Sequence, residues 1–258
     1  MELRPEQLAT QAASQPLAPV YLIAGPELLR VIEAADAVRA RARTEGIGER
    51  EVFDADGRDF DWGQLSSSFN APSLFSSRRL IELRLPGGKP GKEGAEVIGD
   101  FCAQPPADVV LLITAGEWSK SHHGKWADAV NRAGVLSVAW AIKPHELGDW
   151  IERRLRGKGV RAEPAAVQRL SERVEGNLLA AAQEIDKLAL LANGEVLDVA
   201  KMEELVANAA RYDVFRLVEA AFSGQPQPSR LRASRMAACT RSCACWPACA
   251  VKARRWPR

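Results

Sequence analysis

The stretch VYLIAGPELLRVIEAADAVRARAR, residues 20–43, contains the two kinds of segment from which the rest of the fold is built. Its first five residues, Val20–Ala24, form an unbroken apolar run, which is typical of a strand buried on both faces of a parallel sheet. The remainder has the pattern of an amphipathic helix. Its apolar residues recur at spacings of three and four: Leu28, Ile32, Ala35 and Val38. A buried strand followed by such a helix predicts a unit of an α/β fold.

The same alternation continues through about the first 140 residues. Apolar runs predict further strands at residues 51–54, 79–85, 108–115 and 134–142. Helical patterns separate them, at residues 60–69, 94–103 and 125–133. Five strands alternating with helices predict a parallel sheet covered by helices on both faces, in a domain that spans residues 1–142.

After Pro144 the pattern becomes wholly helical. Four helices are predicted, at residues 145–160, 163–174, 177–192 and 197–210. The first of them places four apolar residues on one face: Leu147, Trp150, Ile151 and Leu155. Asn177 and Asp198 are suited to cap the last two helices. The sequence therefore predicts a small all-helical domain over residues 143–210, and a further helix begins within residues 211–224.

The composition indicates a cytoplasmic protein that does not enter a membrane. Apolar residues make up 47% of the chain, as in ordinary globular proteins. The longest apolar run, Val109–Ala115, is far too short to cross a bilayer. The amino-terminal residues lack the apolar core of a secretory signal.

The strand–loop–helix at the start of the fold carries no nucleotide chemistry. Its loop reads AGPELLR, with one glycine, no lysine and no serine or threonine, so the parts of a P-loop that touch phosphate and magnesium are absent. The run VVLLITAG at residues 109–116 lacks the acidic residue that holds magnesium in a Walker-B strand. Neither the dinucleotide fingerprint nor a nucleophile elbow occurs. We therefore expect no bound cofactor and no catalytic residue.

Histidines and clustered basic residues add little. His122 and His123 are adjacent in the polar segment SKSHHGKW, and surface exposure is favoured over metal binding because no spaced partner ligand is nearby. His145 follows Pro144 and is expected near a helix start. The basic run at residues 153–161 could meet phosphate, but a solvated helix face is favoured.

Several segments together resemble one protein family. The segment EGNLLAAAQEIDKLALL, residues 175–191, is similar to the signature of the bacterial DNA polymerase III delta subunit, a component of the clamp loader. The resemblance covers about residues 1–224 in the expected order. It takes in four more segments: PVYLIAGPELLRVIEAADAVR, APSLFSSRRLIELRLP, KWADAVNRAGVLSV and ANAARYDVFRLVEAAFSG.

The resemblance implies an architecture and a role. Residues 1–142 would be an AAA+-like α/β domain without a P-loop that binds the clamp, residues 143–210 a helical lid, and residues 211–224 the start of a helical collar that is otherwise largely missing. Delta subunits bind the beta sliding clamp and open its ring, while neighbouring motor subunits of the loader bind and hydrolyse ATP. The implied loader partners are the gamma/tau and delta-prime subunits. DNA is reached through the assembled complex. The chain itself would not be catalytic, although the holoenzyme is a DNA-directed DNA polymerase.

The resemblance also implies which residues touch the clamp: Pro72, Ser73, Leu74 and Phe75. Leu74 and Phe75 match the hydrophobic wedge of the family, whereas Pro72 stands where a methionine is common. The pattern alone leaves a second reading open, in which both apolar side chains pack beneath the strand predicted at residues 79–85.

The last segment of the chain, residues 225–258, does not fit the family. Residues 220–258 hold eight basic and no acidic residues, whereas residues 1–219 carry a net charge of −6. Four of the five cysteines lie in this tail, at Cys239, Cys243, Cys245 and Cys249. The tail also lacks helical periodicity and a sustained apolar face, which favours a frameshift near residues 224–228. A zinc site is disfavoured because the cysteine spacing differs from that of paired zinc knuckles. Loss of the collar would weaken assembly with the other loader subunits.

Two other functions remain open from the residues. A degenerate AAA+ ATPase would require nucleotide binding, which the loop AGPELLR argues against. A DNA-binding adaptor would usually present a basic face, and the net charge of −6 over residues 1–219 argues against one.

Overall fold

The computed structural model describes residues 1–57, 59–71, 78–192 and 195–211. The chain divides into two compact units. The first comprises Met1–Ile151 and Leu170–Ala182, and the second comprises Glu152–Arg169 and the described residues after Ala182. Within the described ranges, no helix combines the length and the apolar character that a membrane crossing requires.

A six-stranded, wholly parallel sheet forms the centre of the first unit, in the order β1-β6-β2-β5-β4-β3. Its strands are β1 Glu2–Leu3, β2 Val20–Ala24, β3 Glu49–Asp54, β4 Arg79–Leu85, β5 Val109–Ala115 and β6 Val135–Val138. Leu22 of β2 lies opposite Ile113 on one side and Leu136 on the other. Every residue of β2 is buried, as its unbroken apolar run predicts.

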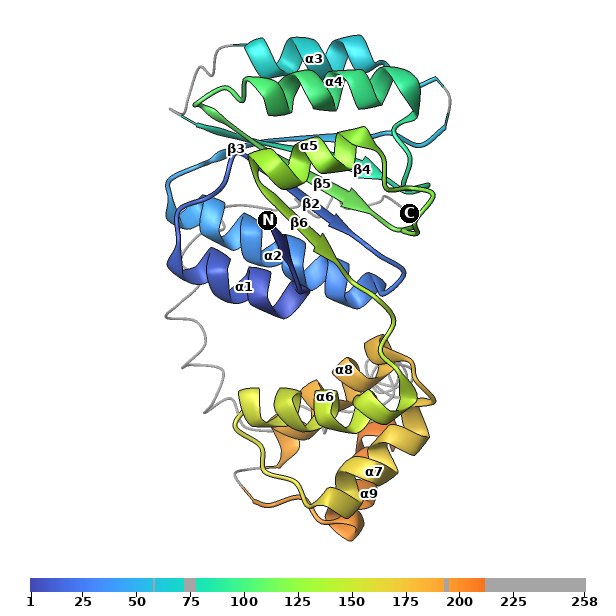
Figure 1. Cartoon of the computed structure of the whole chain (residues 1–258). Coiled ribbons are helices and arrows are strands. Elements are labelled where there is room, and N and C mark those ends of the chain that lie inside the picture. The colour runs from blue at the N-terminus through green and yellow to red at the C-terminus, as the bar shows by residue number, and fades with distance from the viewer. Residues whose placement is uncertain (58, 72–77, 193–194, 212–258) are drawn as a thin grey trace, which may run out of the picture. The chain divides into compact units, whose positions relative to one another are not determined.

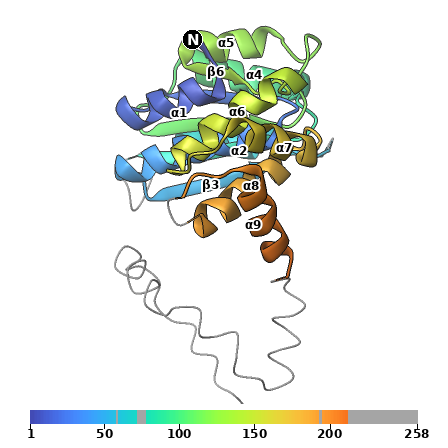
Figure 2. The ribbon, with the colours of Figure 1, turned by 90° about the horizontal axis from the view of Figure 1, so that it is seen from below.

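Helices cover both faces of this sheet, which confirms the predicted α/β class (Figure 1). On one face lie α1 Pro5–Ser14 and α2 Leu28–Thr44. On the other lie α3 Trp62–Asn70, α4 Gly91–Ala103 and α5 Lys125–Ala133. The view from below shows the same layers, with β6 between α5 and α1 (Figure 2).

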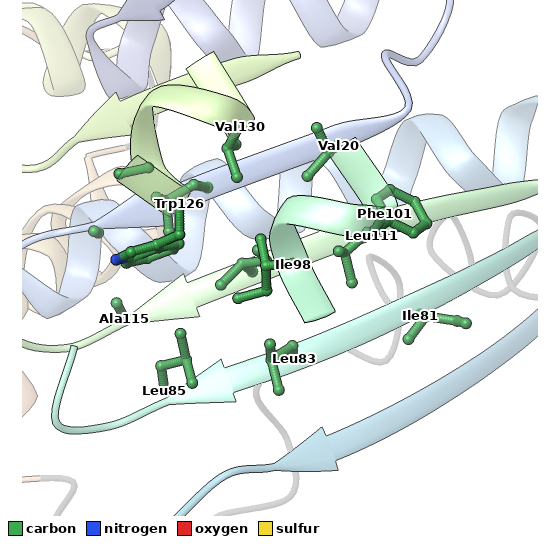
Figure 3. Packing of buried hydrophobic residues seen from close by; sticks show 14 of the residues in the cluster. Val20, Ile81, Leu83, Leu85, Ile98, Phe101, Leu111, Ala115, Trp126 and Val130 are labelled. Atoms are coloured by element: carbon green, nitrogen blue, oxygen red, sulfur yellow. The ribbon is translucent and has the colours of Figure 1, made fainter. Parts of the chain in front are cut away.

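The larger apolar core lies between the sheet and the helices α3, α4 and α5. Figure 3 shows Ile98 and Phe101 of α4 and Trp126 of α5 pointing onto side chains of the strands beneath them. Strand residues in this core include Leu83 of β4 and Leu111 of β5, both fully buried. A second core, on the α1 and α2 face, holds the alternate residues of the same strands.

The sequence prediction missed one strand and one helix. Six strands lie within the described ranges where five were expected, because β1 pairs with β6 at the edge of the sheet. The helix α1, which follows β1, was not predicted either. The strand expected at residues 134–142 ends at Val138.

The prediction also placed the buried face of α2 partly wrongly. Leu28 and Ile32, expected in the core, are 59% and 46% exposed. The buried residues of α2 are Val31, Ala34, Ala35, Val38 and Ala42. These side chains are small, so the helix can lie close to strands whose own side chains, such as Ile23 and Leu112, are large.

Four helices follow the sheet, as predicted: α6 Pro144–Gly157, α7 Pro164–Val174, α8 Leu178–Leu191 and α9 Val199–Arg211. The four apolar residues expected on one face of α6 are all buried. Asn177 caps α8 by accepting a hydrogen bond from the Ala180 amide, and Asp198 caps α9 in the same way. The expected collar start after Arg211 and the cysteines of the tail lie outside the described residues.

Candidate functional site

The four residues expected to touch a clamp, Pro72, Ser73, Leu74 and Phe75, lie outside the described residues. The structure does describe both flanks of the segment 72–77. The chain reaches it from α3, whose last residue is Asn70, and leaves it for β4, which begins at Arg79. The geometry of these two flanks is therefore what the structure contributes to this candidate site.

The amino-terminal flank, α3, is fixed firmly to the rest of the domain. Asp61 caps the helix by accepting a hydrogen bond from the Gln64 amide at 3.0 Å. Near the other end, Phe69 is buried against Phe101 of α4, with ring centroids 4.7 Å apart. The neighbouring Ser68 is also buried, and its hydroxyl hydrogen-bonds to a carboxylate oxygen of β3. The last turn of α3 is thus held by apolar packing and by polar contacts.

The carboxyl-terminal flank is fixed through two consecutive arginines that point to different partners. Arg79 is 4% exposed, and its Nη2 donates to the carbonyl oxygen of Ser68 at 2.9 Å. Arg78 donates from Nη1 to Glu45 Oε2 at 2.8 Å, and Arg41 donates from Nε to Glu45 Oε1 at 2.8 Å. The side chains that follow segment 72–77 therefore reach both α3 and the end of α2.

The carboxylate of Glu45 accepts the hydrogen bonds from both Arg78 and Arg41. Burial works to raise its pKa, but hydrogen bonds from Arg41, the Leu17 amide and Arg78 outweigh burial and hold the pKa below its ordinary value. Glu45 is therefore favoured in its ionised form, which accepts hydrogen bonds from both arginines.

The loop between β2 and α2 occupies the position of a P-loop in the strand–loop–helix unit. Gly25 has a φ of +146°, and a Cβ there would lie 2.2 Å from the carbonyl oxygen of Ala139, so only glycine fits. The Glu27 amide donates to the same carbonyl oxygen at 3.2 Å. Burial raises the pKa of the Glu27 carboxyl, with Arg30 opposing the shift. The loop is thus closed against the end of β6 and offers a carboxyl where a P-loop offers lysine and hydroxyl groups.

The histidines are not arranged as a metal site. His122 stacks on Trp118, with ring centroids 6.4 Å apart, and its Nδ1 lies 2.6 Å from Ser119 Oγ. The Nδ1 atom of His123 lies 3.8 Å from Oδ1 of Asp128. Within the described ranges, no three His, Cys, Asp or Glu side chains are grouped so that they could hold a metal ion. His145 is exposed in the first turn of α6, where it was expected.

The basic run at residues 153–161 lies along α6 and the turn that follows. Arg156 pairs with Glu152 one turn earlier, at 2.5 Å, and Lys158 pairs with Asp186 of α8, at 2.9 Å. Arg156, Lys158 and Asp186 are exposed, and Glu152 is partly exposed. The arrangement agrees with a solvated helix face rather than with a phosphate site.

Sequence reasoning did not single out the charged residues inside β4. Arg79 and Glu82 are buried within the run RLIELRL, one toward each face of the sheet. The sequence does show two charged residues within a strand predicted to be buried on both faces, and such residues need polar partners. The partners, on α2, α3 and β3, are distant in sequence and could not be read from it.

The fold and the closed β2–α2 loop together define an AAA+-like α/β protein whose P-loop position lacks the nucleotide-binding residues. Residues 21–138 match the model of the family described as DNA polymerase III, delta subunit. This part of the chain is therefore similar to the DNA polymerase III delta-subunit family.

Two curated relatives extend the similarity beyond that range. The chain is 30% identical over 226 residues to DNA polymerase III subunit delta of Escherichia coli, covering 87% of this chain and 65% of the relative. It is 27% identical over 228 residues to the protein of the same name from Haemophilus influenzae, covering 86% of this chain and 64% of the relative. The chain thus spans a little less than two thirds of the length of these relatives.

A solved structure supports the fold independently. The Bacillus subtilis DNA clamp loader delta protein matches with a TM-score of 0.63 at 19% sequence identity, over 78% of this chain and 62% of that one. At this identity the match concerns the fold, and it agrees with the AAA+-like architecture.

Proposed function

We propose that this chain acts as the delta subunit of a DNA polymerase III clamp loader in the cytoplasm. In this role it binds the beta sliding clamp and opens the ring, and ATP-driven partner subunits then load the ring on primed DNA during chromosome replication. The observation that carries the proposal is the family match over residues 21–138, extended by the alignment of 226 residues with the Escherichia coli protein. The proposed partners are the clamp, the gamma/tau and delta-prime subunits and, through the assembled complex, DNA.

The proposed clamp contact is made by Pro72, Ser73, Leu74 and Phe75, with the two apolar side chains contributing most of the affinity. Support comes from the fixed flanks, which join this short segment to α3 and β4. A clamp pocket that fully buries one such side chain gains about 1.5–3 kcal/mol. Losing both should weaken binding by about three orders of magnitude.

Ring opening in this proposal needs no nucleotide hydrolysis by this chain. Binding energy can select a distorted state of the ring, provided that this state makes better contacts with the subunit than the closed ring does. The β2–α2 loop fits such a role, because Gly25 and Glu27 close it against Ala139 and it holds no phosphate-binding side chain. We therefore expect the purified chain to show no ATP affinity, which distinguishes it from a degenerate ATPase.

The test is the affinity of the 258-residue chain for the sliding clamp of the same organism, measured by surface plasmon resonance. The variant Leu74→Ala/Phe75→Ala should lose about a thousandfold in affinity. The matched control is Leu28→Ala/Ile32→Ala, which removes two exposed apolar side chains from α2 and should bind like the unmodified protein.

Four other results would contradict the proposal in different ways. Equal binding by both double variants would move the contact away from Leu74 and Phe75. No binding by a folded unmodified chain would remove the clamp as a partner. ATP binding, or salt-dependent DNA binding that survives removal of residues 225–258, would favour the ATPase or the DNA-binding adaptor instead.

A further inference from the structure

Arg79 is an unusual residue for the start of a central strand. Its backbone is part of the sheet ladder, between Glu49 of β3 and Val109 of β5. Its side chain is almost fully buried, and within the described residues its buried Nε has no hydrogen-bond partner. A buried guanidinium with an unused donor is costly. The stability of the sheet therefore does not explain why arginine stands here.

The partner of Arg79 is the carboxyl end of α3. Its Nη2 donates to the carbonyl oxygen of Ser68, and this oxygen also accepts the Ala71 amide at 3.3 Å. The last carbonyl groups of a helix lack partners within the helix and form the negative end of its dipole. α3 carries no basic residue in its own last turn. Arg79 supplies the missing cation from the neighbouring strand.

A second hydrogen bond, from β3, holds the same turn of α3. The hydroxyl of Ser68 hydrogen-bonds to Glu51 Oε2 at 2.5 Å. Ser68 is thus held through its carbonyl group by β4 and through its side chain by β3. Because every residue of β3 is paired with a residue of β4, both hydrogen bonds start from adjacent strands of one sheet.

We propose that Arg79 is a positioning residue for the proposed clamp contact, with Ser68 and Glu51 as its supports. It fixes the point at which the chain leaves α3 for residues 72–77, and so lowers the entropy that clamp binding must remove. This inference rests on the proposed function. Pre-organising a binding segment raises affinity mainly by reducing the cost of ordering it.

The experiment compares the clamp affinities of the full-length chain and of its Arg79→Met and Arg79→Lys variants. Methionine keeps an unbranched side chain but cannot donate, so the affinity should fall about tenfold. Lysine keeps the charge at the helix end without the guanidinium fork, so it should restore part of the loss. Circular dichroism and urea unfolding establish that each variant is folded before binding is measured.

Two matched variants separate positioning from a general loss of structure. Arg50→Met removes another sheet arginine, which pairs with Glu82 on the opposite face, and should leave the clamp affinity unchanged. Glu51→Ala removes the acceptor of the Ser68 hydroxyl at an exposed residue, so the protein should fold, and the affinity should fall about threefold. This second variant tests the inference even if Arg79→Met does not fold.

The decisive measurement is whether the effect of Arg79→Met on clamp affinity depends on the presence of Leu74 and Phe75. In the Leu74→Ala/Phe75→Ala background, Arg79→Met should cause no further loss, since there is no longer a wedge to position. An unchanged affinity of Arg79→Met, or the same loss in both backgrounds, would overturn the inference while leaving the clamp proposal intact. A folded unmodified chain that does not bind the clamp would instead overturn the proposed function itself.

Discussion

The guanidinium of Arg39 in α2 forms two parallel hydrogen bonds with the carboxylate of Glu82 in β4, from Nε to Oε1 at 2.8 Å and from Nη2 to Oε2 at 3.0 Å. Arg50 of β3 binds the same carboxylate at 2.6 and 2.8 Å. Glu82 is 1% exposed. Each of its oxygens therefore accepts from two guanidinium groups, and one side chain joins α2, β3 and β4.

Removing this carboxylate should be strongly destabilising. In Glu82→Gln, Arg39 and Arg50 would keep their charges beside a neutral amide, and breaking a buried pair in this way costs about 3–5 kcal/mol. The control is Asp54→Asn, which breaks the exposed pair with Arg84 at 3.4 Å and should cost less than about 1 kcal/mol. Urea unfolding measures both, and similar small losses would show that Glu82 does not join the three elements.

The stability conferred by Glu82 should depend on pH. Burial works to raise its pKa, but the hydrogen bonds from Arg39 and Arg50 outweigh burial, so its pKa lies below the ordinary value of 4.5. A carboxyl whose pKa is lower in the folded state contributes its full stability above the unfolded value and loses it as the pH falls through the folded value. The difference in unfolding free energy between the unmodified chain and Glu82→Gln should therefore be constant near pH 7 and shrink below about pH 4.5. A difference that stays constant down to the acid limit would contradict this.

Two glycines of α4 should respond to alanine in opposite directions. A Cβ at Gly94 would lie 2.5 Å from the Trp62 ring and 2.8 Å from Pro90, so Gly94→Ala should destabilise the domain by about 1–3 kcal/mol. A Cβ at Gly99 meets nothing within 4 Å, so Gly99→Ala should stabilise the helix by about 0.5–1 kcal/mol. Thermal unfolding of the two variants checks the sign of each change, and a shared sign would contradict the packing of Trp62 on α4.

The thiol of Cys102 should react slowly with alkylating reagents, although the residue is only partly buried. Burial raises its pKa to about 11, and Arg132 opposes this in part. At pH 8 its thiolate fraction should be about 100-fold below that of an ordinary thiol, and alkylation should be slowed to a similar degree. Mass spectrometry of the Cys102 peptide after timed iodoacetamide treatment, with the unfolded chain as reference, measures the ratio. Equal rates in the two states would show that the thiol is not shielded.

The sequence predicted well those elements whose signal is local. The strand at residues 20–24 was found because it is a continuous apolar run, and the strand at residues 79–85 because four of its seven residues are leucine or isoleucine. The caps Asn177 and Asp198 were found because capping uses neighbouring residues. β1 was missed because it is only two residues long, and its partner β6 lies more than a hundred residues later in the chain.

The candidate site was predictable to a smaller extent. The absence of P-loop residues from the β2–α2 loop can be read directly in the sequence, but the contact of Gly25 with Ala139, which closes the loop, could not be predicted from it. Arg79 and Glu82 were visible as charges in an apolar strand, yet their partners come from elements that only the fold brings near. The assignment of residues 72–75 to a clamp contact came from family resemblance and stays a prediction.

The order of the strands also has a consequence for synthesis on the ribosome. β2 is made early, but its two neighbours, β5 and β6, begin at Val109 and Val135. Until β5 has been made, the emerging chain therefore carries a fully apolar strand with both edges unpaired, which is the kind of segment that aggregates or recruits chaperones. We expect ribosome-bound chains to become protease-resistant only after Val138 has left the exit tunnel, in a single late step.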